Sequence, residues 1–142
     1  MKHKNSVTQI NIERDKEIIQ LYNKARKIAG SPATTHRICE IAANLPASQF
    51  YISDYWALRY IKDRSRGKRR RFRNPRKQTL YNALFDTFRN LRRKNEYTSL
   101  PLESVVDIAL TQPAPFIGLN PESIHRLLSK RLNIYQYDIR EK

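Results

Sequence analysis

Apolar residues recur at helical spacing along most of the chain, in stretches that are separated by prolines and glycines. The first stretch runs from Ile12 to Ala29, and Gly30 follows its basic last turn. Five further helices are predicted over residues 34–44, 53–64, 75–94, 102–111 and 121–132. Residues 7–12 and 133–142 are expected to form short strands or frayed ends.

Proline and glycine positions agree with this division into helices. Asn74-Pro75 and Asn120-Pro121 each read as a cap followed by a first helical residue, and Ser53 is a further cap. All seven prolines fall between helices or at helix starts, and all three glycines fall outside helix interiors. Because the apolar spacing, the helix caps and the positions of proline and glycine all indicate the same helices, the predicted fold class is all-α.

The two halves of the chain resemble each other. At a shift of 67 residues, 38–47 lies over 105–114 without a gap, and the caps Ser53 and Asn120 stay in register. This predicts a duplication, against the alternative of chance similarity between amphipathic segments. The expected organisation is an arm (1–11), a three-helix unit (12–64), a basic connector (65–75), a second three-helix unit (76–132) and a tail (133–142). The two units either stand apart or pack as one six-helix domain.

Positive charge is concentrated in the middle of the chain. The sequence has 28 Lys and Arg against 13 Asp and Glu, a formal net charge of +15, and residues 62–101 alone carry +11. Nine of the fourteen residues from 64 to 77 are basic. Arginine donors match phosphate, and each phosphate contact releases counterions, so this block predicts salt-sensitive binding to nucleic acid. A solvated linker or a localisation signal is the alternative.

The candidate nucleic-acid-binding residues are the cations of this block, a phenylalanine inside it, and basic residues after the following helix: Arg64, Arg66, Lys68, Arg69, Arg70, Arg71, Phe72, Arg73, Arg76, Lys77, Arg92, Arg93 and Lys94. No helical face needs Phe72, which makes it a candidate for stacking on a base. Trp56 and Tyr60 lie four residues apart in a predicted helix, and a place in the core is favoured for both.

Each predicted unit has three helices, with Pro-Ala in the turn between the last two. This pattern resembles tandem tri-helical helix-turn-helix DNA-binding units of the phage or mobile-element type. The resemblance implies that the third helix of each unit reads bases, through Ser53, Tyr55, Arg59, Ser123, His125 and Arg126. The turns, 45–52 and 112–119, are longer than the usual three or four residues, so the last two helices are alternatively packing elements only.

Sequence patterns for catalysis and metal binding are not found. His3, His36 and His125 share no metal spacing with one another or with Cys39, the single cysteine. The three glycines are too far apart for a phosphate-binding loop, and no paired acidic motif suggests a nuclease. We therefore expect no enzymatic activity, no metal and no cofactor.

The predicted function is non-enzymatic binding of nucleic acid, with DNA favoured over RNA, as in an accessory or regulatory protein of a phage or mobile element. One alternative is a self-associating structural subunit of a nucleoprotein particle, virion-type or ribosome-associated. Another is an adaptor for an acidic protein partner. No apolar run approaches the roughly eighteen residues that span a membrane, and no signal-peptide core follows the basic N-terminus. A cytoplasmic, nucleoid-associated or virion-associated location is expected.

Overall fold

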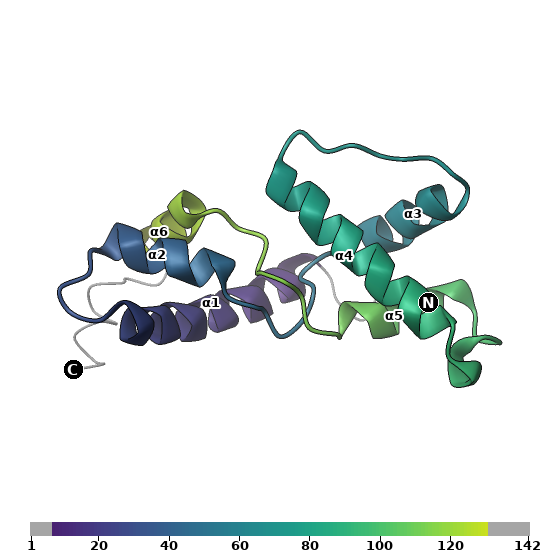
Figure 1. Ribbon diagram of the computed structural model, residues 1–142, viewed down its shortest axis with the longest axis horizontal. Coiled ribbons are helices and arrows are strands. Elements are labelled where there is room, and N and C mark those ends of the chain that lie inside the picture. Colours follow the sequence, from purple (N-terminus) through teal and green to yellow (C-terminus); the bar gives the residue numbers. More distant parts are fainter. Residues whose placement is uncertain (1–6, 131–142) are drawn as a thin grey trace. The chain divides into compact units, whose positions relative to one another are not determined.

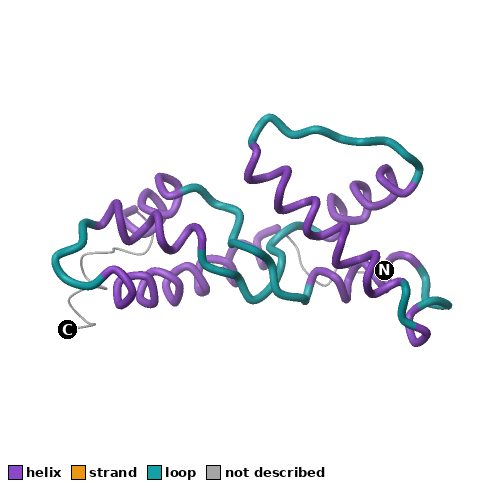
Figure 2. Tube along the Cα trace, in the orientation of Figure 1, coloured by secondary structure: helices purple, strands orange, loops and turns teal. Residues whose placement is uncertain are grey.

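The computed structural model describes residues 7–130, and within that range it contains helices and loops but no strand (Figures 1 and 2). The elements are α1 (Val7–Ala29), α2 (Thr35–Asn44), α3 (Asp54–Ser65), α4 (Pro75–Arg92), a 3-10 turn (Asn95–Tyr97), α5 (Leu102–Leu110) and α6 (Pro121–Lys130). The all-α prediction is confirmed. None of these helices is long and apolar enough to cross a membrane.

Helix ends follow the local signals closely, with one exception. The side-chain oxygens of Ser53, Asn74 and Asn120 each accept a hydrogen bond from a backbone N–H two or three residues later, at distances of 2.7–3.3 Å. These caps satisfy donors that the first turn leaves unpaired. The exception is residues 7–12, which belong to α1 rather than to a strand or frayed end. The predicted end of the last helix at residue 132 and the tail 133–142 lie outside the described residues.

The spacing of 67 residues recurs in the structure. Helices α3 and α6 begin 67 positions apart, at Asp54 and Pro121. The buried side chains of α2 and α5 also correspond at this shift: Ile38, Cys39, Ala42 and Ala43 in one, and Val105, Val106, Ala109 and Leu110 in the other. The structure is therefore compatible with the predicted duplication.

The helices group into two compact units that do not follow the chain consecutively. The central unit comprises Pro46–Gly118 and the start of α1 up to Arg14, and in it α3, α4 and α5 pack against one another. The terminal unit comprises Asp15–Leu45 and the described residues from Leu119 to Lys130, and in it α2 packs against α6. This grouping differs from the expected units 12–64 and 76–132. Helix α3, the third helix of the first repeat, lies in the unit that contains α4 and α5, and helix α6, the third helix of the second repeat, lies in the unit that contains α2 and most of α1.

The long turns after α2 and α5 explain this exchange. A turn of three or four residues holds two helices together, whereas these eight-residue segments let the third helix pack elsewhere. In the central unit the two segments meet at one antiparallel bridge between Ala47 and Ala114.

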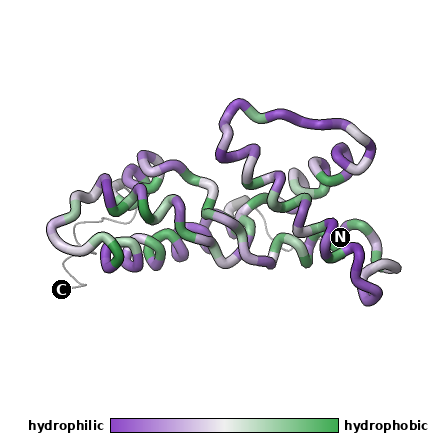
Figure 3. The backbone as a smooth tube through the Cα atoms, viewed as in Figure 1, coloured by the Kyte–Doolittle hydropathy of each residue, from purple (hydrophilic) through white to green (hydrophobic). Residues whose placement is uncertain are grey.

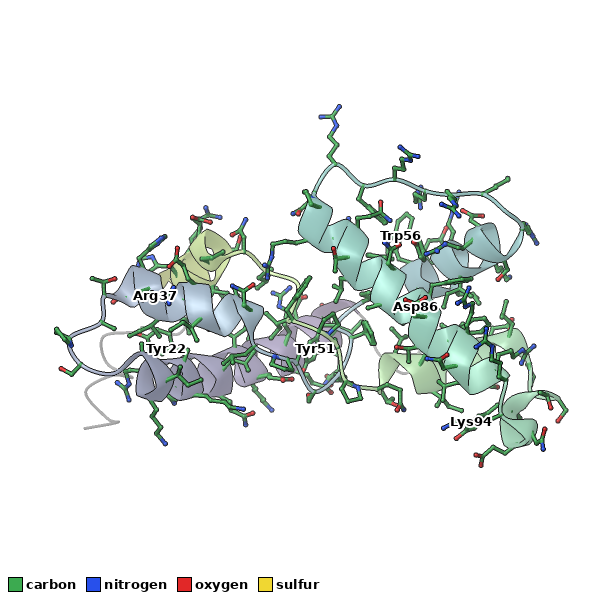
Figure 4. The ribbon with its side chains drawn as sticks, in the orientation of Figure 1. Tyr22, Arg37, Tyr51, Trp56, Asp86 and Lys94 are labelled. Atoms are coloured by element: carbon green, nitrogen blue, oxygen red, sulfur yellow. The ribbon has the colours of Figure 1, made fainter. Side chains whose placement is uncertain are left out.

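The core of the central unit is built from apolar stripes on all three helices. Ala57 and Ile61 of α3 are fully buried, as are Leu84 of α4 and Val105 of α5. Tyr60 is only 2% exposed and Trp56 is 47% exposed, so the placement of Tyr60 in the core is confirmed and that of Trp56 is wrong. Trp56 immediately precedes Ala57 and lies at the edge of the buried stripe, on the side of α3 that faces the loop leading to α4 (Figure 4).

Candidate nucleic-acid interface

The basic segment, residues 64–77, begins on the last turn of α3, crosses a loop over residues 66–74 and ends on the first turn of α4. The loop arches from one helix to the other (Figure 1) and is the most continuous hydrophilic stretch between two helices in Figure 3. All of the segment lies within the central unit, so α3 and α4 hold both of its ends.

Most cations of the basic segment face solvent. The exposed ones are Arg66, Lys68, Arg69, Arg70, Arg71, Arg73 and Lys77. Within residues 7–130, no carboxylate forms an ion pair with the side chains of the loop cations Arg66, Lys68, Arg69, Arg71 or Arg73. Their mutual repulsion is therefore not relieved by the described part of the protein, and an external polyanion would relieve it.

Hydrogen bonds hold the loop at both ends. The backbone N–H of Lys68 donates to the carbonyl of Asp63 at 2.8 Å, which closes the turn after α3. Gly67, with φ of +87°, provides the left-handed conformation that this turn requires. At the other end, the backbone N–H of Phe72 donates to the side-chain carbonyl of Gln78 on α4, at 2.9 Å. The arginines between these points therefore extend from an anchored backbone.

Phe72 is the apolar anchor of the loop. Its ring centroid lies 4.6 Å from that of Tyr81 on α4 and 5.9 Å from that of Tyr60 on α3. Tyr60 and Tyr81 are themselves 5.0 Å apart in an edge-to-face arrangement. The three rings cover one another at distances typical of favourable aromatic pairs. Phe72 thus packs against the helices, and its role in stacking on a base stays a prediction.

An aromatic pocket opens beside this cluster. It is lined by Trp56, Tyr60, Arg70, Phe72, Lys77 and Tyr81, and its volume is about 320 Å³. Two cations stand over its rings: the Arg70 guanidinium lies 5.7 Å from the Trp56 ring centroid, and the Lys77 ammonium lies 4.9 Å from that of Phe72. The pocket therefore combines flat apolar surfaces with positive charge at its edge.

The phenol of Tyr81 is neutral at physiological pH. Burial raises its pKa above the ordinary value of 10.0, the nearby positive charge of Arg70 lowers it by less, and Tyr60 raises it further. A neutral phenol does not repel an approaching phosphate, and its hydroxyl both donates and accepts hydrogen bonds.

Three predicted binding cations have internal partners instead. Arg64 donates to the Tyr60 hydroxyl at 3.2 Å and to the Asn82 side-chain oxygen at 3.0 Å. Arg76 lies 4.3 Å from the Phe116 ring centroid. Arg92 donates to the carbonyls of Tyr97 and Leu100, the latter at 2.7 Å. All three are partly buried, so their first role is to hold the central unit together.

Arg93 and Lys94 remain exposed at the end of α4. They follow Arg92, the last residue of α4, whereas the basic segment ends at Lys77 on the first turn of that helix. Their contribution to the same interface stays a prediction.

The candidates for base readout divide between the two units. Ser53, Tyr55 and Arg59 belong to α3, where Ser53 is the cap and the guanidinium of Arg59 donates to the Tyr55 hydroxyl at 3.2 Å. Ser123, His125 and Arg126 belong to α6 in the terminal unit. Helices α2 and α3, which the helix-turn-helix resemblance would pair, fall in different units. The structure therefore does not reproduce the consecutive helix pair of that motif within one unit.

A larger pocket in the central unit has carboxylates rather than cations in its lining. Its volume is about 410 Å³, and carboxylates from α1, α3 and α5, those of Glu13, Asp54 and Asp107, stand among its lining residues. This lining offers no cation to a phosphate, so the basic segment is the site better suited to a polyanion. Among residues 7–130, no three His, Cys, Asp or Glu side chains gather as metal ligands.

The sequence pattern did not reveal Trp56 and Tyr81 as neighbours of the basic segment. Both occupy helical positions that read as core, and only the return of the loop onto α3 and α4 brings Phe72 and Arg70 to them. No family model matches the chain, and comparisons with curated proteins and with solved structures give no match either.

Proposed function

We propose that the protein binds nucleic acid and that the basic segment grips the phosphate backbone. The observation that carries this proposal is the set of exposed loop cations without an ion pair in the described chain, presented on a backbone that α3 and α4 anchor. Charge of one sign, held close together and facing solvent, attracts a polyanion and releases its condensed counterions on contact.

Arginine dominates the loop, and this favours phosphate over a generic acidic surface. A guanidinium presents a planar fork of donors that matches two phosphate oxygens, whereas a lysine ammonium acts as a point charge. Arg69, Arg70 and Arg71 are consecutive in the chain, so successive side chains offer such forks along one strand of backbone.

Anchoring of the loop is expected to increase its affinity for nucleic acid. A disordered basic tail loses conformational freedom when it binds, and that loss weakens its affinity. Here the Lys68 and Phe72 hydrogen bonds already restrict the loop in the free protein. Less ordering remains for the moment of binding, so more of the electrostatic attraction is retained as affinity.

A charge-matched pair of triple variants tests the proposal. The first combines Arg69→Ala, Arg71→Ala and Arg73→Ala, which spares the pocket residue Arg70. The control combines Lys16→Ala, Lys24→Ala and Lys27→Ala, three exposed lysines of α1, and removes the same charge. Binding to labelled DNA duplex and RNA of equal length is measured near physiological salt.

We expect the first variant to lose at least tenfold in affinity and the control to lose much less, because direct phosphate contacts outweigh the general field of the protein. Equal losses would remove any special role of the basic segment. Absence of binding to both nucleic acids by the unmodified protein would reject the proposal. Self-association or binding of an acidic protein would then be measured.

A further inference from the structure

We infer that the aromatic pocket of the central unit takes an unpaired nucleobase, so that the preferred ligand of the basic segment is single-stranded nucleic acid. This inference rests on the proposed function and adds a ligand class to it. It depends on the pocket lined by Trp56, Arg70, Phe72, Lys77 and buried tyrosines, which phosphate gripping alone does not require.

The shape and size of the pocket suit a flat heterocycle. Its volume of about 320 Å³ lies at the lower end of the range of roughly 300–1,000 Å³ for small-molecule sites. Tyr60 and Tyr81 are 2% and 9% exposed and are the buried part of its lining. Trp56 is 47% exposed and offers its indole to a ligand that enters from solvent. A base that remains paired in a duplex does not present its face, so the pocket selects an unstacked base.

The exposure of Trp56 needs an explanation that packing does not provide. It is the single tryptophan of the chain and stands among the few large apolar side chains that are left exposed in the described residues. Its indole and the Tyr55 ring form an edge-to-face pair, at a centroid distance of 5.0 Å, and the guanidinium of Arg70 lies over the indole. Aromatic rings that project from a basic surface are the usual platform on which single strands stack.

The two cations at the pocket are placed to hold the phosphates beside that base. Arg70 is exposed and lies 5.7 Å from the indole centroid, an arrangement of weak attraction. A base that stacks on Trp56 takes over this face, and the Arg70 guanidinium then turns to the adjoining phosphate. Lys77, over the Phe72 ring at 4.9 Å, is positioned for the phosphate on the other side of the nucleotide.

The rest of the basic segment extends this contact. Arg69 and Arg71 flank Arg70 in the sequence, and a strand whose base occupies the pocket leads its neighbouring phosphates toward them. The pocket therefore supplies stacking and the loop supplies charge, the two components of single-strand recognition without strong sequence preference.

The single tryptophan is also the probe that tests the inference. The full chain is titrated with a thymidine homopolymer of about 16 nucleotides and, separately, with a blunt DNA duplex of the same strand length. Indole fluorescence and polarisation of an end-labelled strand are followed together. We expect tighter binding of the single strand, with quenching of Trp56 fluorescence that the duplex does not produce.

Variants separate stacking from charge. Trp56→Ala is expected to weaken single-strand binding by about tenfold and to leave duplex binding within twofold, since one stacked base contributes on this scale. Trp56→Phe keeps a ring and is expected to restore most of the affinity. Ile28→Ala removes an exposed apolar side chain of the terminal unit and is the control for surface truncation. Circular dichroism and thermal melting confirm that each variant is folded.

The outcomes distinguish this inference from the proposed function. Salt-sensitive binding of the duplex and the single strand with equal affinity, or single-strand affinity unchanged in Trp56→Ala, overturns the inference and leaves the proposed function standing. Absence of binding to both probes rejects the two together. Single-strand preference that is lost in Trp56→Ala and regained in Trp56→Phe supports both.

Discussion

Ala47 and Ala114 exchange two backbone hydrogen bonds, each of 3.0 Å, in which the N–H of either residue donates to the carbonyl of the other. They are 67 positions apart, so the bridge joins equivalent points of the two similar halves of the chain. Both side chains are buried, with exposures of 2% and 3%. Each alanine follows a proline, Pro46 or Pro113, that ends the preceding helical stretch. The segments that let the third helices change units are therefore tied together at their equivalent residues.

We expect the bridge to stabilise the central unit. Ala114→Pro removes one donor and leaves the Ala47 carbonyl without its partner, which is expected to lower the free energy of unfolding by about 1–3 kcal/mol. Ala114→Gly keeps the N–H and serves as the control. Urea denaturation measures both, and an equal loss in the two variants would show that the hydrogen bond contributes nothing.

Gly118 and Gly67 form a matched pair of glycines for a second prediction. Both have positive φ, +96° and +87°, so alanine at either site is expected to cost about 1–2 kcal/mol in backbone conformation. A Cβ at residue 118 would also lie 3.1 Å from Cδ2 of the buried Leu80, whereas a Cβ at residue 67 meets nothing within 4 Å. Gly118→Ala should therefore lower the melting temperature more than Gly67→Ala, and the reverse order would contradict the packing described for Leu80.

Arg92 and Arg93 are adjacent cations with different expected roles. Arg92 donates to the carbonyls of Tyr97 and Leu100, so Arg92→Ala is expected to destabilise the protein by about 1–3 kcal/mol. Arg93 is exposed, and Arg93→Ala should change stability by no more than about 0.5 kcal/mol. Chemical denaturation of the two variants checks this difference. Equal stability of both would assign Arg92 to the surface rather than to the loop after α4.

Tyr81 predicts a specific loss of stability at high pH. Because burial raises its pKa in the folded state, the unfolded chain releases this proton first as the pH rises above 10. The stability that the neutral phenol contributes is complete below pH 10 and declines as the pH rises through the folded-state pKa. Tyr81→Phe removes this decline, so its stability should fall less steeply above pH 10 than that of the unmodified protein. Urea denaturation across this range, with phenolate absorbance, tests the difference, and parallel curves would contradict it.

Local features of this protein were predictable and non-local pairings were not. Caps such as Ser53 and Asn120 form hydrogen bonds within three residues, so the sequence shows them directly. Which helix packs on which depends on contacts between residues that are dozens of positions apart in the sequence. The spacing of apolar residues shows which face of a helix is buried, but it does not show which other helix covers that face. The spacing of 67 residues was visible, but the exchange of α3 and α6 between units was not.

The same distinction applies to the candidate site. The positive charge of residues 64–77 is a compositional property and was evident from the sequence. The separation of structural from exposed cations was not, because Arg64 and Arg92 find their partners only in the folded chain. Trp56 adjoins the buried stripe of α3 and was therefore predicted to lie in the core, whereas it is exposed and lines a pocket with Arg70 and Phe72 of the loop.

The most direct test of phosphate binding by the basic segment is the salt dependence of affinity for a random-sequence DNA duplex. Each phosphate that a cation neutralises adds about 0.9 to the slope of log K against log salt concentration. We predict a slope of several units between about 50 and 200 mM salt, reduced by two to three units in the variant lacking Arg69, Arg71 and Arg73. A slope below about one, or one that the variant leaves unchanged, would contradict the proposed role of the segment.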